Sequence, residues 1–67
     1  MTEILEGLEE AIKDEQEAQK KYKKLKQQTD DENAKKLFEQ LIEDEKNHEK
    51  SLRSRYQAIK ESLGDEE

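Results

Sequence analysis

Glu15, Glu45 and His48 are the residues of this sequence whose types and spacing best suit chemistry. Glu45 and His48 form a Glu-x-x-His pair, and residues three apart on a helix project from one face about 5–6 Å apart at Cβ, so both can reach one metal ion. Glu15 belongs to the preceding amphipathic segment, and Glu15 and Glu45 are equally distant from a turn expected near Asp30. In an antiparallel pair of helices the two carboxylates would face each other at one height. The spacing therefore predicts a metal site with Glu15, Glu45 and His48 as ligands.

The two glutamates interrupt apolar stripes, at positions where a packed helix would carry an apolar side chain. The first stripe contains Ile4, Leu8, Ala11, Glu15, Ala18, Tyr22 and Leu25, widened by Leu5 and Ile12. The second contains Ala34, Phe38, Leu41, Glu45, His48, Leu52, Tyr56, Ile59 and Leu63, with Leu37 beside it and a break in spacing before Tyr56. Heptad spacing of this kind is typical of antiparallel bundles and coiled coils. Because an unpaired carboxylate in a packed seam costs several kcal/mol, the pattern favours a bound cation.

The periodicity predicts an all-α fold in which residues 1–67 form one two-helix domain, an antiparallel helical hairpin. We expect the helices at about 3–28 and 32–63, with the turn at about 29–31. A hairpin of this size buries one face only, and the sequence has no cysteine for a disulfide. We therefore expect the hairpin to dimerise into a four-helix bundle.

Short signals mark the ends of the second helix. Thr29 followed by Glu32 fits a capping box, and Asp30 is a competing N-cap. Gly64 suits the C′ position after the last turn.

The composition argues against several kinds of partner. Charged residues make up 48% of the chain and the net charge is −6, so neither nucleic acid nor an anionic membrane is expected as a partner. The basic run at 20–24 is interpreted as a solvated helix face. No apolar run approaches the roughly 20 residues that span a bilayer, and the first residues lack the apolar segment of a signal peptide. We expect a cytoplasmic protein.

Other interpretations of the same residues remain open. In one of them, the polar seam residues set the register of a metal-free hairpin dimer that acts as a structural or interaction module. Asp44 and Glu49 flank His48 near the stripe and are the main competitors for the ligand roles. Carboxylate and imidazole ligands suit iron or manganese, and zinc also fits and binds more tightly. Tyr22 lies two turns beyond Glu15 and is either a core aromatic or a catalytic neighbour of the metal ligands.

Two segments resemble the rubrerythrin-like, ferritin-like domains. The sequence Glu15-Gln16-Glu17-Ala18-Gln19-Lys20-Lys21-Tyr22 is similar to the E-x-x-A-x-x-x-Y segment of their first helix. The segment from Leu37-Phe38 to the Glu45-x-x-His48 pair is similar to their second helix. The resemblance covers roughly residues 4–59, which is nearly the whole chain.

The resemblance implies a di-iron centre with two ions per dimer, acting as a ferroxidase on ferrous iron or as a rubrerythrin-like peroxidase on peroxide or dioxygen. Glu45 would bridge the two ions, Glu15 and His48 would each bind one, and Tyr22 matches the tyrosine of the motif. The chain supplies two helices where the family has four, which implies a homodimer or a higher even-numbered oligomer. It lacks the cysteine-rich rubredoxin module, so a peroxidase would need an external electron donor. The half-length layout is also similar to encapsulated ferritins, which implies an encapsulating protein shell.

Overall fold

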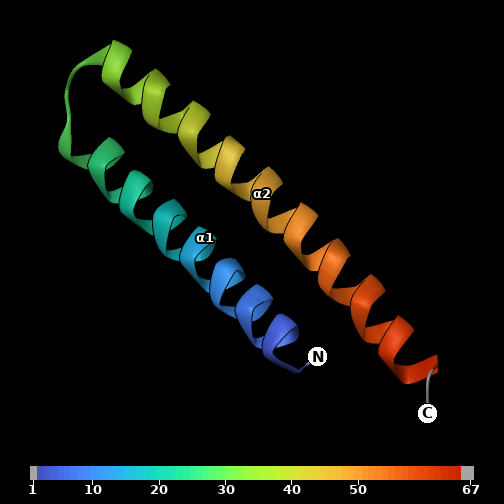
Figure 1. Cartoon of the computed structure of the whole chain (residues 1–67). Helices are drawn as coiled ribbons and strands as arrows, with labels where there is room; N and C mark the ends of the chain where they lie inside the picture. Colours follow the sequence, from blue (N-terminus) through green and yellow to red (C-terminus); the bar gives the residue numbers. More distant parts are fainter. Residues whose placement is uncertain (1, 66–67) are drawn as a thin grey trace.

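The protein is an antiparallel pair of long α-helices. The structure, a computed structural model, describes residues 2–65, with α1 at Thr2–Gln28 and α2 at Glu32–Asp65 joined by residues 29–31. The helices lie side by side along a rod with extents of 55 × 15 × 10 Å, and the start of α1 lies at the same end of the rod as the end of α2 (Figure 1). The prediction of an all-α helical hairpin is confirmed.

The connection between the helices is held by side-chain caps. The backbone N–H of Ala34 donates to Asp31 Oδ2 at 2.8 Å, and the N–H of Lys35 donates to the carbonyl oxygen of Asp31 at 3.0 Å. Asp31 is therefore the N-cap of α2, and the prediction of Thr29 or Asp30 in this role was wrong. The reason is a local turn, in which the hydroxyl of Thr29 accepts the N–H of Asp31 at 3.2 Å and leaves Asp31 at the helix start.

The end of α2 also differs from the prediction. Gly64 lies inside the helix, which continues through Asp65, and no glycine in the described residues has a positive φ. The left-handed C′ conformation expected for Gly64 is therefore absent at this position. Gly7 lies inside α1, and a Cβ at either glycine would meet no atom within 4 Å.

The core lies between the two helices. Ile12 of α1 and Ile42 of α2 are its most buried hydrophobic residues, with 9% and 7% exposure. In α2 a regular heptad series is buried or half-buried, made up of Phe38, Ile42, Glu45, Glu49, Leu52, Tyr56, Ile59 and Leu63. The predicted seam used Leu41 and His48 in place of Ile42 and Glu49, and the predicted break before Tyr56 does not occur in the observed series. Helix α2 is turned so that Ile42 and Glu49 point towards α1.

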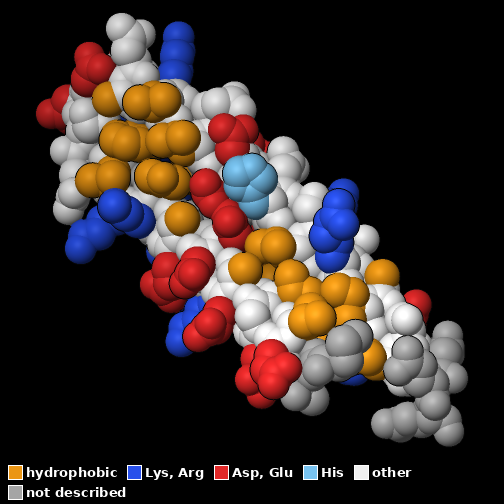
Figure 2. All heavy atoms as spheres, in the orientation of Figure 1, with side chains coloured by type: hydrophobic (Ala, Val, Ile, Leu, Met, Phe, Trp, Pro, Cys, Tyr) orange, Lys and Arg blue, Asp and Glu red, His pale blue; other side chains and the backbone are white. Residues whose placement is uncertain are grey.

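One face of the hairpin keeps its hydrophobic side chains uncovered. Figure 2 shows them in two groups along the rod, separated by acidic side chains and the histidine. Ile4 near the start of α1 is 46% exposed and Leu37 near the start of α2 is 56% exposed. Because the helices are antiparallel, these two residues lie towards opposite ends of the rod. Neither helix, within the described residues, has a stretch long and apolar enough to cross a bilayer.

Candidate metal centre

The structure brings Glu15 of α1 together with Glu45 and His48 of α2. One ligand atom from each of the three side chains lies within 4.8 Å of the other two. His48 Nδ1 is 3.6 Å from Glu15 Oε2 and 3.7 Å from Glu45 Oε2. Both separations exceed the roughly 2.7–3.2 Å of a good hydrogen bond, so the three groups converge without being bonded to one another.

The two carboxylates are largely covered, whereas the imidazole is open to solvent. The side chains of Glu15 and Glu45 are 23% and 19% exposed, and that of His48 is 61% exposed. His48 therefore lies at the rim of the helix interface, on the side that the hairpin leaves open. It is outside the packed seam of the single hairpin because the turn of α2 about its axis brings Glu49 towards α1 in its place. The place of His48 in the core of a four-helix bundle stays a prediction.

Glu15 Oε2 is buried and has no hydrogen-bond donor. Leaving a buried acceptor unpaired costs about 1–3 kcal/mol, and more when the group is charged. A cation between Glu15, Glu45 and His48 would satisfy this oxygen. The donor set of two carboxylates and one imidazole, without thiolate, suits iron, manganese or zinc. The residues present therefore fit a transition-metal ion.

The two competing carboxylates are engaged elsewhere. Asp44 Oδ1 accepts a hydrogen bond from Gln40 Nε2, one turn earlier in α2, at 2.9 Å. Glu49 accepts hydrogen bonds from Gln16, Gln19 and Arg53. The bond from Gln19, followed by those from Arg53 and Gln16, holds the pKa of Glu49 below its ordinary value. Neither carboxylate joins the group formed by the three candidate ligands.

Sequence reasoning missed Gln16 and Gln19, which both reach across to α2. A signal was present, because the two glutamines are three residues apart and lie on the same side of α1 as Ile12. Glutamine is common on exposed helix faces, so this spacing alone could not separate an interhelical contact from a solvated one.

Tyr22 packs its ring against Phe38 of α2. The ring centroids are 6.5 Å apart and the planes differ by 17°, a stacked arrangement within the range of favourable aromatic pairs. Tyr22 is half-buried, and its hydroxyl makes no hydrogen bond to another described residue. Its suggested role beside the metal ligands stays a prediction.

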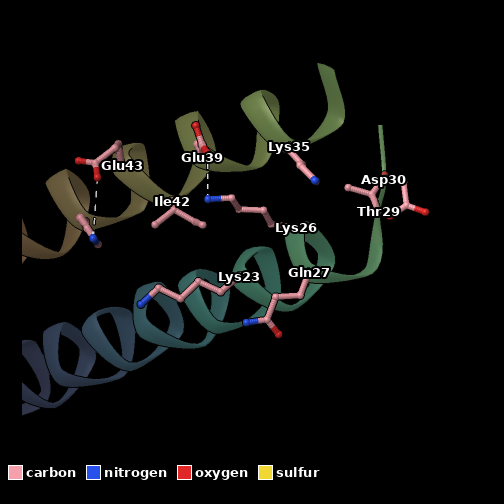
Figure 3. Close-up of a pocket in the computed structure, with 10 residues that line it drawn as sticks. Lys23, Lys26, Gln27, Thr29, Asp30, Lys35, Glu39, Ile42 and Glu43 are labelled. Carbon is pink, nitrogen blue, oxygen red and sulfur yellow. Dashed lines mark ion pairs between the residues drawn. The ribbon is translucent and has the colours of Figure 1, made fainter. Parts of the chain in front are cut away.

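A groove near the connection has a mixed electrostatic character. Lys23, Lys26, Lys35 and Lys46 line it together with Asp30, Glu39 and Glu43, and Ile42 also contributes (Figure 3). Lys26 Nζ lies 2.8 Å from Glu39 Oε1 across the two helices, and Lys46 pairs with Glu43 at 3.8 Å. None of the three candidate metal ligands lines this groove. Of these two pairs only Lys26–Glu39 joins α1 to α2, whereas Lys46–Glu43 lies within α2, and we assign the groove no ligand.

A pair of antiparallel helices carrying a glutamate on one and a Glu-x-x-His on the other provides half the ligands of a di-metal carboxylate bundle. A model of the rubrerythrin family matches residues 6–67, a range that contains all three candidate ligands. The chain therefore belongs to the rubrerythrin family, within the ferritin-like di-iron proteins, as its sequence motifs indicated. No curated protein and no solved structure shows a significant match to it.

Proposed function

We propose that this chain is half of a di-iron carboxylate protein, completed when two copies pack their open faces together into a four-helix bundle. The observation that carries the proposal is the position of Glu15 Oε2, a buried oxygen without a donor at the point where Glu45 and His48 converge. A metal-free interaction module would leave this carboxylate oxygen without a hydrogen-bond donor, with His48 Nδ1 3.6 Å away as its one nearby charged partner when protonated.

The open face supports a second copy as the missing half. Its uncovered hydrophobic side chains lie on both sides of the acidic residues and the histidine, as Figure 2 shows. A two-fold axis through the middle of this face would place each apolar group against the apolar group of the partner, since an isologous interface uses the same surface on both copies. The same axis would bring two sets of Glu15, Glu45 and His48 to one level.

Each ligand has a distinct task in this arrangement. Two copies supply four carboxylates, which balance the charge of two divalent ions. The carboxylates of Glu15 and Glu45 and the imidazole of His48 would hold these ions, the carboxylates neutralising their charge and the imidazole supplying a nitrogen ligand. His48, which is 61% exposed in the hairpin, would become covered by the partner, so the imidazole would be held between the four helices.

Iron held by these residues would supply electron transfer to dioxygen or peroxide, so the protein would be a ferroxidase or a rubrerythrin-like peroxidase. The apolar side chains above and below the ligands would exclude water from the site, which strengthens electrostatic interactions there. A peroxidase cycle consumes electrons, and a chain without cysteine has no thiolate-bound iron of its own to deliver them. Electrons for such a cycle would reach the site from outside this two-helix unit.

Iron content and mass in solution test the proposal together. Protein purified without chelator is reconstituted with ferrous iron under anaerobic conditions. Its iron content is then measured, and its mass in solution is determined by sedimentation equilibrium. About one iron per chain in an even-numbered oligomer is expected from a site shared by two hairpins. Admission of dioxygen or of peroxide to separate samples then identifies the oxidant. A stable helical dimer that binds no iron would refute the proposal and favour the metal-free module.

A further inference from the structure

Glu49 joins the two helices next to the candidate ligands. Gln16 Nε2 donates to Glu49 Oε2 at 3.2 Å, and Gln19 Nε2 donates to Glu49 Oε1 at 2.8 Å, so two amides of α1 bind one carboxylate of α2. Arg53 Nε, one turn further along α2, donates to Oε2 at 2.8 Å and orients the carboxylate from its own helix. The Glu49 side chain is 18% exposed. Gln16, Gln19 and Glu49 are called the Glu49 clamp below.

The Glu49 clamp lies at the level of the candidate metal centre. Gln16 follows Glu15 directly in α1, and Glu49 follows His48 directly in α2. Adjacent helix residues point about 100° apart, so the clamp and the ligands occupy neighbouring sectors of the same turns. Any shift of one helix along the other that changed the height of Glu15 relative to Glu45 and His48 would therefore break the clamp.

Apolar packing alone only weakly specifies the height of Glu15 relative to Glu45 and His48. The seam between the helices repeats every heptad, and hydrophobic attraction has no direction, so a displaced register still buries apolar surface. Hydrogen bonds from two amides to one carboxylate are directional and short-ranged. A polar residue in an otherwise apolar helix interface is a well-attested device for fixing register.

The other cross-helix bonds are further from the ligands. Within residues 2–65, Tyr56 Oη donates to Glu9 Oε1 at 2.8 Å towards the chain ends, and Lys26 pairs with Glu39 at 2.8 Å towards the connection. In both bonds the acceptor is an exposed glutamate, Glu9 or Glu39, and a single interaction with an exposed carboxylate gains little in water. The half-buried Glu49 clamp is therefore the strongest fixed point near the centre of the rod.

We propose that Gln16, Gln19 and Glu49 are positioning residues, which hold α1 and α2 in the register at which Glu15 faces Glu45 and His48. The consequence for metal binding rests on the proposed function, whereas the consequence for register does not. Without the clamp the ligands would all be present, but their relative height would vary, and metal affinity would fall.

The register is measured on metal-free full-length protein. The sequence has no cysteine, so cysteines introduced at the exposed positions Lys13 and Lys50 carry the only two spin labels. The labelled protein is mixed with an excess of unlabelled protein, so that distances between spin labels on different copies are not recorded. Pulsed EPR should give one narrow distance distribution, and this distribution should shift or broaden in Gln19→Ala and in Gln16→Ala/Gln19→Ala. Lys26→Ala, which breaks another cross-helix pair, is the matched control and should keep the narrow distribution.

Metal affinity is measured with Co²⁺, whose visible absorption reports ligand geometry. Gln19→Ala should bind Co²⁺ about 10–100-fold more weakly, as expected when a residue that orients metal ligands is removed. Its absorption spectrum should also change. Glu49→Gln keeps one carbonyl oxygen as acceptor and should recover part of the affinity that Glu49→Ala loses, an effect that general destabilisation does not produce.

The outcomes separate this inference from the proposed function. Unchanged distances and unchanged Co²⁺ affinity in folded Gln19→Ala would overturn the positioning role. Failure of the unaltered protein to bind Co²⁺ or iron would overturn the metal site, and the EPR distances would still decide whether the clamp sets the register. The single variant Gln19→Ala keeps the test available if the double variant does not fold.

Discussion

Glu15 Oε2 lies 3.6 Å from His48 Nδ1 on the opposite helix and yet accepts no hydrogen bond. The two atoms approach from different helices, one buried and one at the open rim. This arrangement places an unsatisfied carboxylate oxygen beside an imidazole on the face that retains exposed hydrophobic side chains. A cation shared by these two groups would satisfy the oxygen.

Removal of one candidate ligand should abolish iron binding. Glu45→Gln keeps the size of the side chain and removes its charge, so the iron content should fall from about one ion per chain to almost none. Glu17→Gln is the matched control, because Glu17 is 61% exposed and pairs with Lys20 on the surface of the same helix pair. Iron analysis after anaerobic reconstitution checks both variants. Equal iron content in the two variants would contradict the assignment of Glu45.

Removal of the metal should lower the melting temperature. Ligands bind in their deprotonated forms, so bound metal stabilises the folded state, and a chelator should reverse this stabilisation. Circular dichroism melts of iron-loaded protein with and without chelator measure the effect. The Glu15→Gln variant serves as the control, since its melting temperature should not respond to chelator. A loaded wild-type protein that ignores the chelator would speak against a metal in the helix interface.

A charge on the open face should weaken association. Leu37 is 56% exposed in the hairpin, so Leu37→Glu should leave the helices formed but place a carboxylate in the proposed dimer interface. Ser54→Glu makes the same change in charge at an exposed polar position of α2. Sedimentation should show a shift towards monomer for Leu37→Glu and none for Ser54→Glu. Identical oligomeric states would indicate that another surface joins the copies.

The pair of Tyr56 and Glu9 gives a pH dependence with a defined sign. The hydrogen bond to Glu9, with smaller contributions from desolvation and from the charge of Glu9, raises the pKa of Tyr56 above its ordinary value. Because the folded pKa is raised, the stabilisation is complete below the unfolded pKa of about 10 and is lost as the pH rises through the folded pKa. Glu9→Gln should lower the Tyr56 pKa, measured as the tyrosinate absorbance that Tyr56→Phe removes. An unchanged titration would show that the bond does not persist in solution.

An alanine at Gly7 should stabilise the hairpin by about 1 kcal/mol, because glycine is unfavourable inside a helix. The added Cβ would meet no atom of the chain within 4 Å. Urea unfolding of Gly7→Ala checks the prediction. A loss of stability would indicate that another chain approaches α1 closely at this point.

The sequence by itself determined the helices, their antiparallel pairing and the meeting of the three candidate ligands. Helical periodicity fixes which residues share a face, and the equal spacing of Glu15 and Glu45 from the turn fixes their common height. Both properties follow from the chain alone because they depend on distances along a helix. The family match over residues 6–67 agrees with the motifs that carry these ligands.

The tertiary structure alone decided how α2 is rotated about its axis. Each helix carries two neighbouring seams, one residue apart, as at Leu41 and Ile42, and their periodicity is the same. Only the packed structure shows that Ile42 and Glu49 turn towards α1. This rotation leaves His48 at the rim of the helix interface, and it leaves the seam that contains Leu41 on the open side of the hairpin. Periodicity in one chain cannot make that choice, because either seam buries apolar surface. In the packed hairpin it is Glu49 that accepts hydrogen bonds from Gln16 and Gln19 of α1.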